Sequence, residues 1–145
     1  MSKILITGAT GFIGKHLVEY LIARNNKVYC LIRNPAKLGD LASKAMLIYG
    51  DLENIDKIND SDLADFDYIY HFAGITKHYD KNYYFKINNN STRQLIDRVI
   101  KLYGVAGKLK RFVFCSSQAA AGPTDIYKRV LESDAPQPIN SYGKS

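Results

Sequence analysis

The chain has 145 residues, of which 46% are hydrophobic and 23% are charged, and these values are ordinary for one soluble globular domain. No apolar run approaches the ~20 residues that a membrane-spanning helix needs, and the N-terminus does not have the form of a signal peptide. The basic residues behind the net charge of +6 are interleaved with acidic ones, which argues against a nucleic-acid partner. We therefore expect one cytoplasmic domain over residues 1–145, with no membrane partner.

Strand-like and helical patterns alternate along the chain. The strand-like segments are 3–7, 27–32, 45–49, 67–72 and 110–115. Several are continuously apolar, which is typical of parallel strands that are covered on both faces. The helical patterns occupy 12–24, 35–43, 54–64 and 82–103, and Asn25 and Asn26 can supply a left-handed stop to the first helix.

This alternation predicts an α/β fold with a doubly wound parallel sheet, in the strand order 3-2-1-4-5. Ligands of such sheets bind over the carboxyl ends of strands 1 and 4, where the strand order reverses. Residues 119–140 contain three prolines and predict a loop-rich segment near the same edge of the sheet.

The cysteines and histidines predict neither a disulfide nor a metal site. Cys30 and Cys115 lie in apolar, strand-like stretches, and a cytosolic setting favours buried thiols. None of the three histidines has a cysteine or a second histidine at ligand spacing. His71 ends an apolar strand, so we expect a hydrogen-bonded core histidine there and not a catalytic one.

Three glycines stand between the first strand and the first helix. Gly8 permits a tight turn, Gly11 lets the backbone approach a pyrophosphate, and Gly14 lets the helix pack closely on the sheet. The N-terminus of that helix presents free N–H groups and a partial positive charge. The segment therefore predicts a dinucleotide site.

Residues after the second and third strands indicate which dinucleotide binds. Arg33 stands where such folds meet the adenosine ribose, and its guanidinium suits a 2′-phosphate better than a 2′-hydroxyl. Lys37 could add a second positive charge, so NADP is preferred over NAD, although a solvated arginine at the end of a strand would look the same. Asp51 can accept a hydrogen bond from the adenine amino group while Leu52 covers the ring, although a plain turn aspartate would look the same.

The chain resembles the extended short-chain dehydrogenase/reductase superfamily, which includes the NAD-dependent epimerase/dehydratases. The resemblance rests on residues 7–14, 50–52, 71–74, 87–88 with 91–92, 114–117 and 142–145. Residues 115–123 are similar to the dihydroflavonol-reductase-like branch, with sugar epimerases as close competitors. The resemblance implies a Rossmann-like domain and hydride transfer on a carbonyl, alcohol or nucleotide-sugar substrate.

By this resemblance, Ser117 would hydrogen-bond the oxygen of the substrate and Tyr142 would be the catalytic acid/base. Asn88 is expected to join a helix to a loop. The residues predicted to bind the cofactor, from the motifs and the resemblance together, are Gly8, Thr10, Gly11, Phe12, Ile13, Gly14, Arg33, Lys37, Asp51, Leu52, Phe72, Ala73, Gly74, Thr76 and Tyr142.

In that superfamily a lysine four residues after the tyrosine lowers the pKa of the phenol, which is about 10 when free. Here that position lies one residue beyond Ser145, and Lys144 is only two residues after Tyr142. We therefore expect the N-terminal part of a longer enzyme, inactive alone, whose last strand leaves an apolar edge that favours a homo-oligomer. The alternative is a non-catalytic NAD(P)-binding sensor or scaffold.

Overall fold

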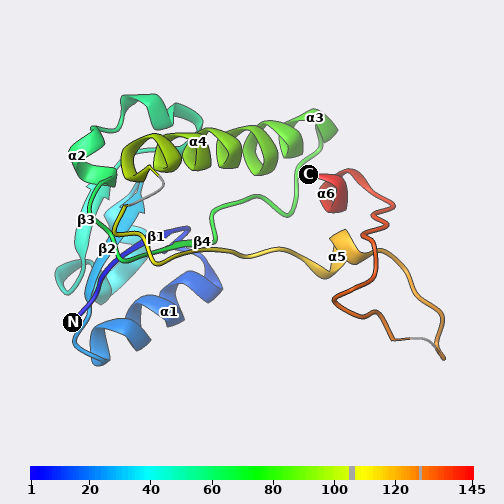
Figure 1. Cartoon of the computed structure of the whole chain (residues 1–145), viewed down its shortest axis with the longest axis horizontal. Coiled ribbons are helices and arrows are strands. Elements are labelled where there is room, and N and C mark those ends of the chain that lie inside the picture. The colour runs from blue at the N-terminus through cyan, green and yellow to red at the C-terminus, as the bar shows by residue number, and fades with distance from the viewer. Residues whose placement is uncertain (105–106, 128) are drawn as a thin grey trace.

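The computed structural model describes residues 1–104, 107–127 and 129–145. Its centre is one parallel sheet of five strands in the order β3-β2-β1-β4-β5 (Figure 1), which confirms the predicted topology. In chain order the strands are β1 (Lys3–Thr7), β2 (Lys27–Ile32), β3 (Met46–Tyr49), β4 (Tyr68–His71) and β5 (Arg111–Phe114).

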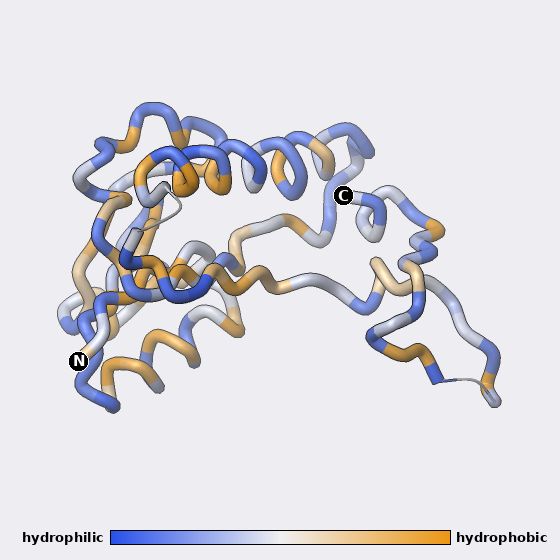
Figure 2. The backbone as a smooth tube through the Cα atoms, viewed as in Figure 1, coloured by the Kyte–Doolittle hydropathy of each residue, from blue (hydrophilic) through white to orange (hydrophobic). Residues whose placement is uncertain are grey.

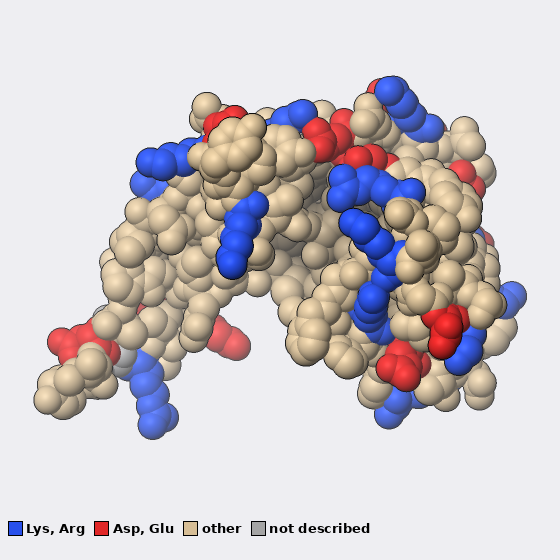
Figure 3. All heavy atoms as spheres, turned by 180° about the vertical axis from the view of Figure 1, so that it is seen from behind, with Lys and Arg blue, Asp and Glu red and all other residues tan. Residues whose placement is uncertain are grey.

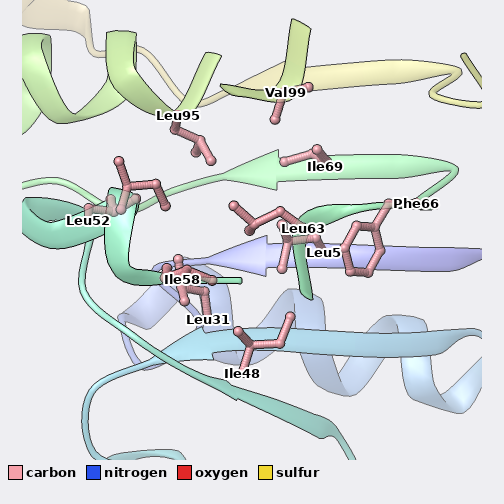
Figure 4. Packing of buried hydrophobic residues seen from close by; sticks show 11 residues of the cluster. Leu5, Leu31, Ile48, Leu52, Ile58, Leu63, Phe66, Ile69, Leu95 and Val99 are labelled. Carbon is pink, nitrogen blue, oxygen red and sulfur yellow. The ribbon is translucent and has the colours of Figure 1, made fainter. Parts of the chain in front are cut away.

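Helices cover the two faces of this sheet. Helix α1 (Phe12–Ala23) lies on one face, whereas α4 (Thr92–Tyr103) and α2 (Asp60–Leu63) lie on the other (Figure 1). Successive residues of a strand point to opposite faces, so Ile4 packs toward α1 and Leu5 toward α4. Each face of the sheet carries its own hydrophobic cluster. Figure 4 shows the cluster that contains Leu5, in which side chains of the strands meet those of α4 and of the segment before β4.

The end of α1 agrees with the sequence prediction. The helix stops at Ala23, and Asn25 has a φ of 58°, in the left-handed region. Asn residues tolerate this conformation better than most others, and it returns the chain toward β2.

Three predicted helices differ from the structure. Residues 54–64 form a 3₁₀ segment, η2 (Leu52–Lys57), and then the short α2, because Ile58 is extended between them. Residues 82–103 form three helical segments in succession, namely α3 (Lys81–Tyr84), a π-helix η3 (Phe85–Ser91) and α4. The predicted helix at 35–43 is the 3₁₀ segment η1 (Pro35–Ser43), which kinks at Gly39.

Arg98 fastens α4 to the irregular segment beneath it. Its guanidinium donates to the carbonyl oxygens of Ile55 and Ile58, and its Nε donates to Asp60 Oδ1 at 2.9 Å. A fixed fork of donors suits this arrangement, because each carbonyl needs a partner where water is excluded. The extended Ile58 is thus held on both sides, because its N–H donates to the carbonyl oxygen of Ile55 at 3.2 Å and its own carbonyl oxygen accepts from Arg98.

The chain after β5 lies beside the sheet body and carries little core. Figures 1 and 2 show it running out past α5 (Gln118–Ala121) and returning to α6 (Ser141–Lys144). Cys30 is buried as predicted, but Cys115 is exposed, because β5 ends at Phe114 on the outer side of the sheet. Among the described residues, no helix combines the length and the apolar character that crossing a membrane requires.

His71, the last residue of β4, is buried and hydrogen-bonded, as predicted. Its side chain has 0% exposure, and its Nδ1 lies 2.6 Å from Thr7 Oγ1 while its Nε2 lies 2.9 Å from Thr92 Oγ1. Burial lowers the pKa of His71 from 6.5 to about 4, because the apolar surroundings disfavour the imidazolium. The imidazole therefore ties β1, β4 and α4 together in its neutral form.

This histidine predicts a loss of stability in mild acid. The pKa is lower in the folded than in the unfolded chain, so the stabilisation is complete above about pH 6.5 and is lost as the pH falls toward 4. We expect the free energy of unfolding, measured in urea, to fall by about 2 kcal/mol between pH 7.5 and pH 5 through this group. His71→Gln should be less stable at pH 7.5 and have a flatter profile; parallel profiles would contradict the assignment.

Candidate functional site

The glycine turn between β1 and α1 is packed too closely for side chains at two of its three glycines. A Cβ atom on Gly8 would lie 2.5 Å from the backbone nitrogen of Ala73, and the φ of Gly8 is +73°. A Cβ atom on Gly14 would lie 2.2 Å from the carbonyl oxygen of Gly8. A Cβ atom on Gly11 would lie 3.3 Å from the carbonyl oxygen of Gly8 and would have no other close neighbour, so Gly11 is the least crowded of the three glycines. The turn is fixed by its contact with the end of β4.

Two cavities meet over this turn. One has a volume of about 240 Å³ and the other of about 750 Å³. Both are lined by Gly8, Gly11, Phe72, Ala73 and Gly74, so they form one cleft over the carboxyl ends of β1 and β4. Figure 3 shows the surface hollowed between the sheet body and the C-terminal segment. This is the position that the strand order predicts for a ligand.

The smaller cavity runs from the turn toward β2 and β3. Arg33 lies at its mouth with 71% of its side chain exposed, and its Nη1 lies 3.4 Å from Asp51 Oδ2. The other carboxylate oxygen of Asp51 accepts a hydrogen bond from the backbone N–H of Glu53 at 3.2 Å and caps η2. Asp51 therefore already has partners for both oxygens, while Leu52 offers an apolar side chain to the same cavity.

The outer wall of the smaller cavity contains residues that the sequence analysis missed. Glu53 and Tyr83 both line it, and the Tyr83 hydroxyl donates to Glu53 Oε1 at 2.7 Å. Lys86 Nζ lies 2.6 Å from Glu53 Oε2. These residues come from η2, α3 and η3, and no local motif relates them. Of these three residues, only Glu53 could have been suggested by the sequence, because it directly follows the predicted site residues Asp51 and Leu52.

The larger cavity runs from the turn toward the C-terminal segment. Ser117 and Tyr142 line it together with Thr76. Ser117 Oγ accepts a hydrogen bond from the backbone N–H of Ala119 at 3.2 Å and caps α5. The ring of Tyr142, on α6, lies 6.0 Å from the ring of Tyr84, measured between centroids. The two predicted catalytic side chains thus share one cavity.

Asn88 connects this end of the cleft to the π-helix, as expected. Its Oδ1 accepts a hydrogen bond from the backbone N–H of Ile75 at 2.8 Å, and its Nδ2 donates to the carbonyl oxygen of Ile75 at 3.0 Å. The same Nδ2 lies 3.0 Å from Ser145 Oγ. The loop after β4 and helix α6 are therefore held by one amide.

Most residues predicted for the site lie around the cleft, although their roles stay predictions. Lys37 is the exception, because it is exposed on η1 and lines neither cavity. The predicted residues that line the cleft are Gly8, Thr10, Gly11, Phe12, Ile13, Gly14, Arg33, Asp51, Leu52, Phe72, Ala73, Gly74, Thr76, Ser117 and Tyr142.

These features fit an extended anionic ligand such as a dinucleotide. A Cβ atom on Gly8 or Gly14 would collide with backbone atoms, so the close turn that shapes the cleft depends on glycine. The cleft opens beside the first turn of α1, whose free N–H groups favour phosphate. Within the described residues, no group of three or more His, Cys, Asp or Glu side chains is placed to hold a metal ion.

Comparisons with known proteins agree with this geometry. The curated relatives include the sterol demethylase protein B of Methylococcus capsulatus, 35% identical over 121 residues, with coverage of 81% of this chain and 35% of the relative. The UDP-arabinose 4-epimerase 1 of Arabidopsis thaliana is 27% identical, with coverage of 100% and 37%. The chain thus spans little more than a third of the length of these two relatives.

Solved structures with the same fold include MoeE5 in complex with UDP-glucose and NAD, 27% identical, with a TM-score of 0.79 and coverage of 98% of this chain and 44% of the other. A UDP-glucuronic acid 4-epimerase variant from Bacillus cereus, in complex with a fluorinated UDP-sugar acid and NAD, is 30% identical, with a TM-score of 0.79 and coverage of 98% and 48%. The sequence pattern of one family matches residues 4–145. By that match, the chain belongs to the NAD dependent epimerase/dehydratase family.

Proposed function

We propose that this chain is the cofactor-binding part of an NAD(P)-dependent enzyme that acts on a nucleotide sugar or a related alcohol or carbonyl compound. The observation that carries the proposal is the single cleft that joins the glycine turn to Ser117 and Tyr142. A site that only sensed a dinucleotide would have no use for a serine and a tyrosine in its second cavity. Similar proteins bind NAD together with UDP-sugars, which supports this substrate class.

The dinucleotide would lie across the turn, with its adenosine in the smaller cavity and its nicotinamide in the larger one. When bound, it supplies the hydride donor or acceptor. The chain contributes the phosphate-facing N–H groups of α1, an apolar contact from Leu52, and the hydroxyl groups of Ser117 and Tyr142. Ser117 would hold the substrate oxygen and Tyr142 would move the proton, as in general acid–base catalysis.

Gly11→Ala tests whether the turn binds the pyrophosphate. A Cβ atom at this position would lie 3.3 Å from the carbonyl oxygen of Gly8, a tight contact that a small shift of the turn would relieve, so we expect the chain to stay folded with a loss of about 1 kcal/mol in unfolding free energy. Gly11 lines both cavities, so a side chain there should hinder the close approach of the pyrophosphate, and the affinity for NADPH and NADH, measured by calorimetric titration, should fall by about 10-fold or more. Unchanged affinity for both dinucleotides would refute the proposed binding mode.

Arg33 supports a preference for NADP, because it is the only lysine or arginine among the described residues that line the smaller cavity. A guanidinium pairs with a phosphate in two parallel hydrogen bonds. We expect wild-type chain to bind NADPH more tightly than NADH, and Arg33→Gln to weaken NADPH binding about 10-fold while NADH binding changes little. Lys37→Gln is the matched control, since Lys37 lies outside the cleft. Equal losses for the two dinucleotides would contradict this role.

The chain as given should show little or no turnover. A tyrosine hydroxyl exchanges its proton readily near neutral pH when a cation lies beside it. No lysine or arginine is found among the described residues that line the larger cavity, and Lys144 is exposed outside it. We expect no consumption of NADPH with carbonyl substrates and no conversion of UDP-glucose, followed by absorbance and chromatography. Substantial turnover would show that another group performs the task of the lysine.

A further inference from the structure

The smaller cavity carries a negative charge that the dinucleotide motif does not account for. Glu53 lines this cavity together with Arg33 and Asp51, and 21% of its side chain is exposed. Asp51 is engaged by Arg33 and by the cap of η2, whereas Glu53 faces the opposite way along the wall, toward α3 and η3. One guanidinium and two carboxylates therefore share a volume of about 240 Å³.

Glu53 is held rigidly as a carboxylate. Tyr83 donates to its Oε1 at 2.7 Å, Lys86 lies 2.6 Å from its Oε2, and the Tyr83 ring packs on His78 with centroids 4.2 Å apart. These hydrogen bonds, that of Lys86 first, lower the pKa of Glu53, and the carboxylate in turn raises the pKa of Lys86. At neutral pH the glutamate is ionised, and its charge cannot move away from the cavity without breaking both bonds.

The position of this charge matters for one part of a dinucleotide. A ribose 2′-phosphate brings close to two negative charges, whereas a 2′-hydroxyl brings none. Arg33 and Glu53 line the same cavity of about 240 Å³, so a phosphate that binds Arg33 there lies in the electrostatic field of the glutamate. Lys86 does not line the cavity, but it lies against Glu53 and neutralises it. Repulsion by Glu53 and its relief by Lys86 therefore act on the 2′-phosphate and hardly on the hydroxyl.

We propose that Glu53 and Lys86 form a selectivity pair, in which the glutamate disfavours the 2′-phosphate of NADP and the lysine offsets that repulsion. This inference rests on the proposed function, because it requires the adenosine part of a dinucleotide in the smaller cavity. If the pair acts in this way, the preference between NADP and NAD depends on the charges of Glu53 in η2 and Lys86 in η3 as well as on Arg33. Tyr83 is the positioning residue that fixes the glutamate.

The test is a calorimetric titration of the chain with NADPH and with NADH, for wild type and two variants. Glu53→Gln removes the negative charge and should raise the ratio of NADPH to NADH affinity by about 3- to 10-fold. Lys86→Met leaves the glutamate uncompensated and should lower the ratio by a similar factor. Both shifts should shrink when salt is raised from about 0.05 to 0.5 M, since screening acts on charges and not on shape.

Asp56→Asn is the matched control, because it removes one negative charge from the same segment η2 at an exposed position outside the cavity. Its affinity ratio should equal that of wild type. If both dinucleotides bind and neither variant changes the ratio, or both variants change it in the same direction, the selectivity pair is wrong and the proposed function stands. If wild-type chain binds neither dinucleotide, the proposed function and the inference that rests on it both fail.

Discussion

The close contact of the β1–α1 turn with the end of β4 is the constraint on which the cleft depends. Gly8 lies so near Phe72 and Ala73 that even one methyl group would collide with backbone atoms, and Gly14 touches Gly8 in the same way. Backbone atoms cannot move aside as side chains do, so β1, α1 and β4 must share one arrangement. The cleft opens where this arrangement ends. The position of the cleft is therefore set by backbone packing at the glycine turn.

Charged side chains around the smaller cavity add a second constraint on what can bind there. Arg33 is already paired with a carboxylate, because Asp51 lies 3.4 Å from it, and Glu53 lines the same cavity. An anion that binds Arg33 must compete with these carboxylates. Exposed pairs of this kind are worth little each, so the competition is mild and its outcome is sensitive to a neighbour such as Lys86. On the proposed function, the preference between NADP and NAD depends on several weak interactions around the smaller cavity, and Arg33 is only one of them.

The parts of the fold that were predictable are those with local causes. Parallel buried strands are continuously apolar, so all five strands were placed within two residues of their observed ends, and Asn25 marked the end of α1 through its tolerance of positive φ. The single helix predicted at 54–64 was wrong, because Arg98 stabilises an extended Ile58 from a distant helix. Tyr83 could not be predicted either, because its role depends on a long-range contact: its hydrogen bond to Glu53 joins residues 30 positions apart. Lys37 shared its sequence neighbourhood with Arg33, but η1 carries it away from the cleft.

The two ends of the cleft differ in how firmly they are held. The smaller cavity is walled by residues such as Leu31 and Leu52, which belong to the buried core beneath α4. Ser117 and Tyr142 lie in the C-terminal part of the chain. None of the described residues after Val99 is buried, and Phe114 is 52% exposed. Segments with few buried contacts open at low free-energy cost. The proposed dinucleotide site is therefore firmly packed at the smaller cavity, whereas the distance between Ser117 and Tyr142 is held by few buried contacts. The core that fixes the turn does not extend to the hydroxyls of Ser117 and Tyr142, so the proposed cofactor binding and the proposed chemistry rest on parts of the chain that are packed to different degrees.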